Sequence, residues 1–127
     1  MESGAISDAQ ISASTEWDTY TAAIHGRLHV RAIENIAGAW SARTKDASQW
    51  LQIDLIGQES IVTRVATQGR DGFDQWVTQY RLQYSNDSSN FQDYTEDGEN
   101  ATKVKHFNQL NHEIGRASCR ERVFRAV

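Results

Sequence analysis

The chain has 127 residues, of which 39% are hydrophobic and 24% charged, as expected for one ordinary globular domain. Its formal net charge is −4, and residues 1–112 hold no cluster of Lys and Arg of the kind that binding to nucleic acid requires, which excludes nucleic acid as a partner. No apolar run reaches the ~18 residues of a membrane span, and the first residues show neither the basic start nor the apolar stretch of a signal peptide.

Apolar residues alternate with a period of two along much of residues 1–112, which predicts β-strands. In chain order we expect strands at residues 11–13, 49–55, 61–67 and 76–84, with weaker ones at 91–95 and 103–107. Residues 20–36 hint at a helix, although their apolar period is poor. Many short strands separated by polar turns predict an all-β antiparallel sandwich or barrel.

The last fifteen residues differ in character from the rest and contain four of the thirteen basic residues. Residues 114–123 can be back-translated as ATC GGA AGA GCG TCG TGT AGG GAA AGA GTG, which resembles a common short-read sequencing adapter. We therefore expect 113–127 to be a non-native tail, although a natural basic tail is the alternative. Without it the net charge is −6 and no Cys remains, so Cys119 says nothing about the redox compartment.

Residues 1–112 resemble the discoidin domain, also called the coagulation factor V/VIII type C domain. Blocks that match this family in order are Met1–Ile6, Gln10–Ser14, Ala39–Ala42, Gln49–Leu55, Val65–Arg70, Asp74–Tyr80 and Gln83–Asp87. The resemblance implies an eight-stranded jelly-roll sandwich of galactose-binding-like type, an extracellular or cell-surface setting, and binding of glycans, proteins or anionic phospholipid.

Two features common in this family are absent: a pair of Cys residues that brackets the domain, and the closing strands with their apolar and aromatic residues. We therefore expect residues 1–112 to be a partial domain, incomplete at the C-terminus. Missing strands leave unpaired edges and exposed core, so we expect the chain to fold poorly alone.

By position, the resemblance implies that three loops form a binding rim: residues 15–25, 41–46 and 69–75. The first loop offers Trp17 and Tyr20, whose rings can lie on a sugar or enter a lipid interface. The alternative for Trp17 is burial beneath its own loop. The second loop offers Arg43 and Lys45, which bind oxygen acceptors, against the alternative of a solvated turn.

The third loop offers Arg70, Asp71, Phe73 and Asp74 as ligand-binding residues. Gly69 and Gly72 permit positive φ and a close approach of the backbone to a ligand, which would place Phe73 at the tip. An ion pair between Arg70 and Asp71 is a competing interpretation. Asp74 can instead bond backbone amides, and we expect Trp76 to begin the core strand.

Other combinations of residues give weaker signals. His25 and His29 have helical metal spacing but no third ligand, and we expect no metal site and no cofactor. Calcium is the open alternative, because Asp18, Asp46, Asp71 and Asp74 could contribute oxygens, although no loop has EF-hand spacing. We find no motif of a nucleophile, base or phosphate loop, so we expect no enzyme. Asn86 and Asn100 begin glycosylation triplets.

The leading functional hypothesis is an extracellular adhesion module that recognises cell-surface or matrix glycans and proteins. A membrane phospholipid surface is an alternative, which mixed loop tips and an acidic domain disfavour. A structural spacer domain with no ligand of its own is a further alternative. The identity of the ligand, the parent architecture and the oligomeric state cannot be deduced from these residues.

Overall fold

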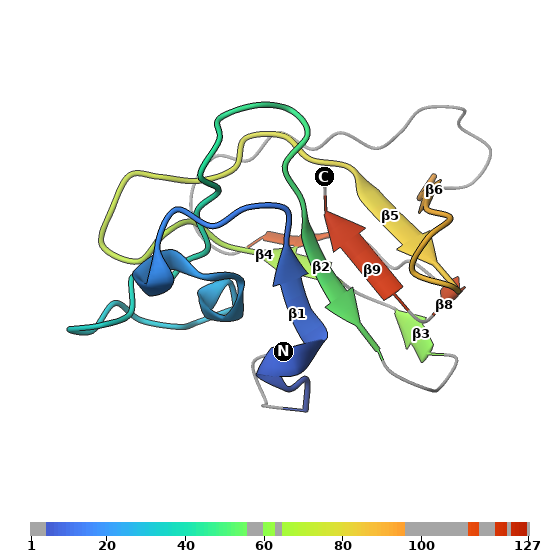
Figure 1. Cartoon of the computed structure of the whole chain (residues 1–127), viewed down its shortest axis with the longest axis horizontal. Coiled ribbons are helices and arrows are strands. Elements are labelled where there is room, and N and C mark those ends of the chain that lie inside the picture. Colours follow the sequence, from blue (N-terminus) through green and yellow to red (C-terminus); the bar gives the residue numbers. More distant parts are fainter. Residues whose placement is uncertain are drawn as a thin grey trace.

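The computed structural model describes residues 5–55, 60–62, 65–95, 112–114, 119–121 and 123–126. Within them, nine β-strands and three short 3-10 helices alternate with loops. The largest sheet has five strands in the order β1-β2-β9-β5-β6, and two-stranded ladders join β3 to β8 and β4 to β7. β4 lies behind β2 in the view of Figure 1, so the strands form two layers. The predicted jelly-roll sandwich is confirmed at the level of fold class.

The front sheet begins with the segments whose apolar period is clearest. β1 (Ile11–Ala13) pairs antiparallel with β2 (Leu51–Asp54) in the register Ile11 to Ile53. β5 (Leu82–Ser85) pairs with β6 (Gln92–Asp93), so Gln83 lies opposite Asp93. These strands confirm the predictions at 11–13, 49–55 and 91–95, and the last two are shortened to the part that has a pairing partner.

Two predicted strands differ from the structure. Residues 61–67 do not form one strand, because β3 (Ser60–Val62) and β4 (Val65–Thr67) pair with different partners. The expected strand at 76–84 is wrong in its first half: residues 76–81 form no strand, and Trp76 is 40% exposed. The alternating apolar residues there belong to a loop, and only Tyr80, near the end of that loop, is buried in the core. The weak strand expected at 103–107 lies outside the described residues.

The helix hinted at in residues 20–36 is also wrong. This stretch contains η2 (Thr19–Thr21) and η3 (Ala23–His25), each a single 3-10 turn, followed by a loop with an isolated bridge between Ile33 and Ile36. A third 3-10 turn, η1 (Asp8–Gln10), precedes β1. None of the helices among the described residues could cross a lipid bilayer.

Three strands include residues of the predicted tail, 113–127, and the first of them begins one residue earlier, at His112. β7 (His112–Ile114) pairs with β4, β8 (Cys119–Glu121) with β3, and β9 (Val123–Ala126) with both β2 and β5. The strand edges that we expected to be unpaired are therefore covered here. Ladder hydrogen bonds join backbone groups, which all residues share. The pairing therefore does not test whether these residues are native to the domain. Their non-native origin stays a prediction.

The described core is small and lies between the layers. Its buried apolar residues are Ile11, Ala23, Tyr80 and Leu82. Val65 and Tyr94 pack against Tyr80 and Leu82, and burial raises the pKa of the Tyr80 phenol despite a hydrogen bond with Thr67. Thr21 and Ser85 are the buried polar residues of the described part. This core holds the strands beneath the loops that project from one end.

Candidate functional site

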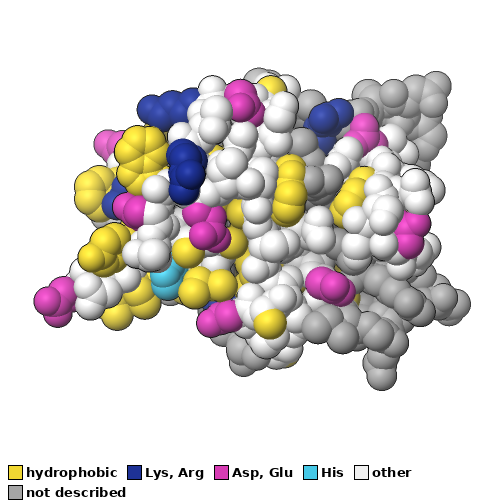
Figure 2. Space-filling model, in the orientation of Figure 1, with side chains coloured by type: hydrophobic (Ala, Val, Ile, Leu, Met, Phe, Trp, Pro, Cys, Tyr) yellow, Lys and Arg dark blue, Asp and Glu magenta, His cyan; other side chains and the backbone are white. Residues whose placement is uncertain are grey.

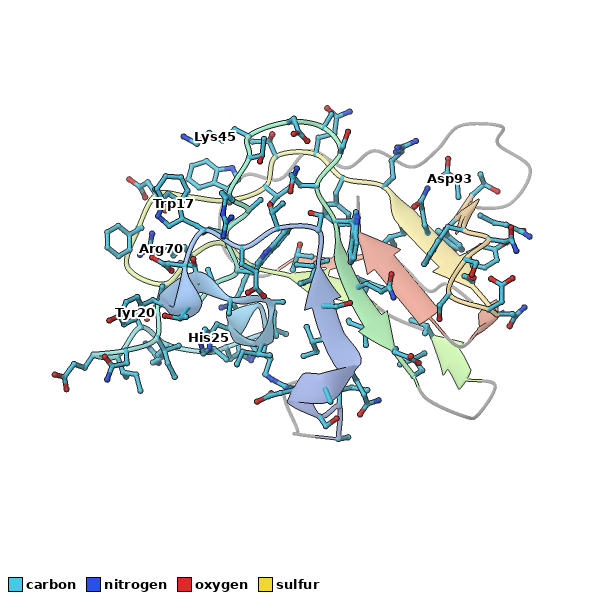
Figure 3. The ribbon with its side chains drawn as sticks, viewed as in Figure 1. Trp17, Tyr20, His25, Lys45, Arg70 and Asp93 are labelled. Carbon is cyan, nitrogen blue, oxygen red and sulfur yellow. The ribbon has the colours of Figure 1, made fainter. Side chains whose placement is uncertain are left out.

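The three predicted loops lie together at one end of the molecule. Figure 3 shows Trp17, Tyr20, Lys45 and Arg70 at this end, with Asp93 at the other. In Figure 2 apolar side chains gather at the same end, with basic and acidic side chains between them. We call the residues 15–25, 41–46 and 69–75 at this end the rim.

Hydrogen bonds from the loop bases fix the first and second loops to each other. The Trp17 amide donates to the Ser41 carbonyl (2.9 Å), and the Arg43 amide donates to the Thr15 hydroxyl (3.0 Å). The Arg43 side chain also donates through Nε to the Glu16 carbonyl (3.1 Å). Arg43 therefore helps to hold the two loops together, although it remains exposed to solvent.

Indole Nε1 of Trp40 donates to the Thr15 carbonyl (2.9 Å), which anchors the start of the first loop from below. The hydroxyls of Ser14 and Thr15 both donate to Gln49 Oε1, at 2.7 and 2.6 Å. Glu16 accepts from the Ala23 amide at 2.7 Å. The loop that carries the candidate aromatic residues is therefore held at both ends.

The aromatic side chains of the first loop are exposed. Trp17 is 61% exposed and Tyr20 50% exposed, so the structure selects exposure over burial for Trp17. Asp18, a candidate calcium ligand, instead accepts from the backbone amide (2.9 Å) and hydroxyl (2.7 Å) of Thr21 at the start of η2. Its carboxylate therefore holds the turn that displays the two rings.

The third loop places an arginine against an aromatic ring. Arg70 lies with its guanidinium carbon 4.1 Å from the centre of the Phe73 ring, and its Nη1 donates to Gln75 Oε1 (3.0 Å). Its Nε is buried and has no hydrogen-bond partner. Phe73 is 56% exposed. The loop therefore presents an aromatic face backed by a cation whose orientation is already set.

Backbone contacts close this loop tightly. The Arg70 amide donates to the Gln75 carbonyl (2.8 Å), and the Gln75 amide donates to the Phe73 carbonyl (2.8 Å). Gly72 has φ +73°, as predicted for this loop. Gly69 does not have a left-handed backbone. A Cβ at Gly69 would instead lie 3.1 Å from the Gln75 carbonyl oxygen, which is a tight contact.

The competing interpretation, an ion pair between Arg70 and Asp71, is not what the structure shows for these two residues: Asp71 accepts from the Ala32 amide (2.9 Å), and Arg70 donates to Gln75. Asp74 is exposed and Lys45 is exposed. Asp46 accepts from the Ser48 amide (2.8 Å) and from the Gln49 side chain (2.9 Å), the latter being the larger cause that lowers the pKa of its carboxyl.

The described residues contain no group of three or more His, Cys, Asp or Glu side chains that could hold a metal ion. His25 is half-buried in η3, and His29 is exposed with φ +62°. They therefore do not share a helical face, and the i, i+4 reasoning does not apply to them.

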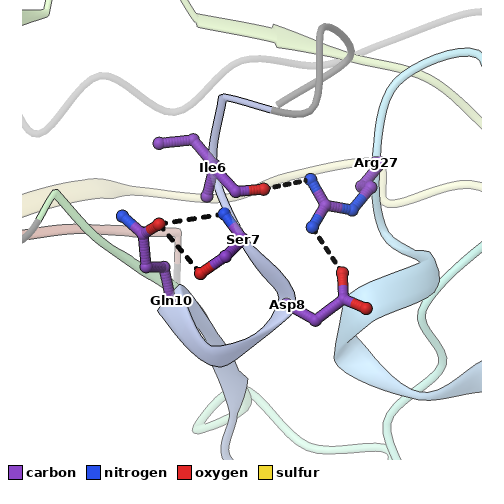
Figure 4. A network of polar contacts seen from close by, with 5 residues as sticks. All are labelled: Ile6, Ser7, Asp8, Gln10 and Arg27. Carbon is purple, nitrogen blue, oxygen red and sulfur yellow. Dashed lines mark hydrogen bonds and ion pairs between the residues drawn. The ribbon is translucent and has the colours of Figure 1, made fainter.

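Arg27 joins the N-terminal turn to the base of the loops. Its Nη1 donates to the Ile6 carbonyl (2.7 Å), and its Nη2 pairs with Asp8 Oδ1 (2.5 Å), as Figure 4 shows. In the same turn, Gln10 Oε1 accepts from the amide (2.9 Å) and hydroxyl (3.0 Å) of Ser7. The Arg27 side chain is 15% exposed, so this contact is a structural one that steadies the segment after η3.

Sequence reasoning missed part of the exposed apolar surface. Ile33 is 66% exposed, Val77 59% and Trp76 40%, and none of them was a candidate. The pattern Ile33-Glu34-Asn35-Ile36, two apolar residues around a polar pair, could have signalled the short turn that exposes Ile33. Trp76 and Val77 carry no such signal, since they read as the start of a strand.

A polar pocket of ≈ 290 Å³ lies at the opposite end, in the turn after β5, lined by Tyr84, Ser85, Asn86, Asp87, Asn90 and Gln92. Its acidic group, Asp87, is occupied by the turn itself, because it accepts from the amides of Ser89 (2.9 Å) and Asn90 (2.8 Å). Asn86 is exposed there, and Asn100 lies outside the described residues. The pocket is therefore a turn feature rather than a second binding site.

A sandwich of two β-layers with exposed aromatic loops at one end is the architecture of a ligand-binding module. Residues 10–117 match the model of the F5/8 type C domain, and the chain belongs to this family. The resemblance drawn from the sequence is therefore confirmed.

Curated relatives include retinoschisin. The chain is 43% identical to that of Takifugu rubripes over 90 residues and 36% identical to that of Mus musculus over 92 residues. Each match takes in 68% of the chain, but only 31% and 39% of the respective relative, so the chain spans about a third of their length.

Solved structures share the fold at low sequence identity. Discoidin II from Dictyostelium discoideum superposes with a TM-score of 0.74 at 21% identity, over 91% of this chain and 47% of that one. A CBM32 module from Clostridium perfringens, in complex with GalNAc-β-1,3-galactose, superposes with a TM-score of 0.67 at 15% identity, over 92% and 81%.

Proposed function

We propose that the chain is an extracellular adhesion module that binds cell-surface or matrix glycans, free or carried on proteins, through the rim. The observation that carries the proposal is the pair formed by Phe73 and Arg70: an exposed ring backed by a guanidinium that Gln75 holds in place. Such a ring can stack on the apolar face of a sugar while the cation bonds its hydroxyl or carboxylate oxygens. Trp17 adds a second exposed ring.

Three observations support a binding rather than a catalytic role in an extracellular setting. The chain belongs to a family of binding modules. A module of the same fold holds a disaccharide in its solved structure. Asn86, the first residue of a glycosylation triplet, is exposed and directly follows β5, whose end points away from the rim in Figure 1, so an attached glycan would leave the rim free.

The test is a glycan array followed by calorimetry with the best ligand. We expect Phe73→Ala and Trp17→Ala each to weaken binding on the order of tenfold, because each removes a ring that stacks on the sugar. Arg70→Lys should weaken it as well, since an ammonium keeps the charge but loses the planar fork.

The matched control is Arg81→Lys, because Arg81 is also exposed but pairs with Asp93 at the far end of the molecule (3.7 Å). It should bind as the unchanged chain does. A blank array together with no binding to intact cells would refute the proposal and favour a spacer domain, and binding that survives all three rim substitutions would place the ligand outside the rim.

A second candidate, a phospholipid surface, is favoured by one observation: six large apolar residues of the described part are exposed, namely Trp17, Tyr20, Ile33, Phe73, Trp76 and Val77. Apolar loop tips can enter the interfacial region of a bilayer. The acidic charge of the chain opposes binding to anionic lipid. Sedimentation with vesicles of phosphatidylcholine, with and without phosphatidylserine, tests this candidate. Strong binding to the vesicles that contain phosphatidylserine would replace the glycan proposal.

A further inference from the structure

A short hairpin outside the three predicted loops projects from the same end of the molecule. Ile33 and Ile36 form an antiparallel bridge in which each amide donates to the other residue's carbonyl, at 2.9 and 3.0 Å. Glu34 and Asn35 are therefore the two residues of its turn. In Figure 1 this segment, coloured between blue and green, forms the outermost point of the loop end. We call residues 31–38 the tip hairpin.

The tip hairpin is fastened to the third loop of the rim. The Ala32 amide donates to Asp71 Oδ2 (2.9 Å), and just before the hairpin the His29 amide donates to Gln68 Oε1 (2.7 Å). Asp71 therefore serves as a structural link between the two loops. A ligand on the Phe73 side of the third loop would have the tip hairpin as its neighbour.

The other arm of the tip hairpin is fastened to the first loop, because the Ala37 amide donates to the Tyr20 carbonyl (2.9 Å). Gly38 then turns the chain with φ +65° and is buried against the Val30 carbonyl and the Ala32 amide, where a Cβ would lie 2.9 Å from each. The tip hairpin therefore has a fixed position relative to the rim, so its exposed side chains are arranged before any partner arrives.

The chemistry of the tip favours a protein as the occupant. Residues 31–35 are all exposed, and Ile33 is the most exposed large apolar residue described, at 66%. An aliphatic side chain offers no flat ring for a sugar. Arg31 and Glu34 flank it with opposite charges, so the tip lacks the basic surround of a site for anionic lipid. An apolar centre with a mixed polar edge is instead the anatomy of a protein–protein contact.

We propose that the tip hairpin is a fourth recognition loop, and that its partner is a protein with an apolar pocket that receives Ile33, with Arg31 and Glu34 at the edge of the contact. The proposal rests on the proposed function of the rim and deepens it: the rim binds a glycan, and the tip hairpin binds the protein next to that glycan.

The experiment measures binding of the full chain to intact cells, with Ile33→Thr as the variant and Val77→Thr as the matched control. Both substitutions replace an exposed β-branched aliphatic residue, but Val77 lies outside the tip hairpin. We expect Ile33→Thr to weaken cell binding on the order of tenfold and Val77→Thr to leave it within about twofold, because a few central contacts dominate protein interfaces.

Two further measurements identify the occupant. After protease treatment of the cells, Ile33→Thr and the unchanged chain should bind equally, because the protein that contacts Ile33 is gone. On a glycan array the two should also bind equally. Circular dichroism and the unfolding midpoint should be the same for both, since Ile33 is exposed.

The proposal is overturned if Ile33→Thr binds intact cells as the unchanged chain does. It is also overturned if Ile33→Thr loses the same factor on phosphatidylcholine vesicles, which would make the tip a membrane anchor, or on the glycan array, which would place Ile33 on the sugar. If the unchanged chain binds neither cells nor glycans, the proposed function itself fails and the tip hairpin proposal falls with it.

Discussion

Two glycines share a left-handed backbone but differ in what surrounds them. Gly38 has φ +65°, with the Val30 carbonyl and the Ala32 amide 2.9 Å from the place of a Cβ. Gly72 has φ +73° and nothing within 4 Å of that place. At Gly72 only the backbone conformation requires glycine, whereas at Gly38 the packing requires it too.

The two substitutions Gly38→Ala and Gly72→Ala should therefore separate these causes. We expect Gly72→Ala to lower the free energy of unfolding by about 1 kcal/mol, the cost of a left-handed alanine. Gly38→Ala should lower it by roughly 3 kcal/mol or more, because the backbone around it must also shift. Urea unfolding measures both. Equal losses would mean that the surroundings of Gly38 yield freely.

At the scale of one element, the turn between β5 and β6 is organised by a single carboxylate. Asp87 accepts from the amides of Ser89 and Asn90, from the Asn90 side chain (2.6 Å) and from the Ser85 hydroxyl (2.9 Å). The hydrogen bond from the Asn90 amide is the first cause that holds the pKa of Asp87 far below its usual range. Because the folded pKa is lowered, the ionised carboxylate stabilises the fold.

This contribution should be fully present above the unfolded pKa of about 3.9 and be lost as the pH falls through the lower folded pKa. Between about pH 5 and pH 2, the unchanged chain should therefore lose more stability than Asp87→Asn, whose amide does not titrate. The control, Asp74→Asn, makes the same charge change on an exposed rim residue. Urea unfolding at several pH values would contradict this if Asp87→Asn and the unchanged chain ran parallel.

At the scale of the whole molecule, the front sheet depends on one strand from the end of the chain. β9 lies between β2 and β5, with Gln52 and Gln83 both opposite Arg125. Without it, β1-β2 and β5-β6 would be two separate two-stranded sheets with exposed edges. Two-stranded hairpins are marginal in water, so the sheet needs a strand in this slot.

We therefore predict that the full chain unfolds cooperatively as a monomer, whereas a chain ending at residue 111 shows no cooperative transition and aggregates. Thermal melting with size-exclusion chromatography measures this. If the truncated chain melts as the full chain does, residues 112–127 are dispensable for folding. If the full chain aggregates, the expectation from the sequence that it folds poorly alone is supported.

The fold and the general place of the site could be predicted from the sequence, because both follow from local patterns and from ordered blocks of a known family. Leu51–Asp54 alternates in the sequence and is a strand in the structure. The exposure of Trp17 could not be predicted, because it depends on hydrogen bonds from loop bases that are distant in sequence, such as that between Trp17 and Ser41. The exposure of Trp76 could not be predicted either, because the sequence pattern places it at the start of a core strand.

The sequence by itself determined the class of fold and the family, and it predicted the loops that we propose to bind a ligand, because strand periodicity, turn chemistry and family blocks are properties of short segments. Only the tertiary structure decided how those loops are joined to one another. The sequence shows that residue 71 is an aspartate, but which neighbour its side chain bonds depends on where residue 32 lies in space. That arrival joins the tip hairpin to the third loop, places Ile33 beside the rim, and leaves Arg70 to Phe73 and Gln75.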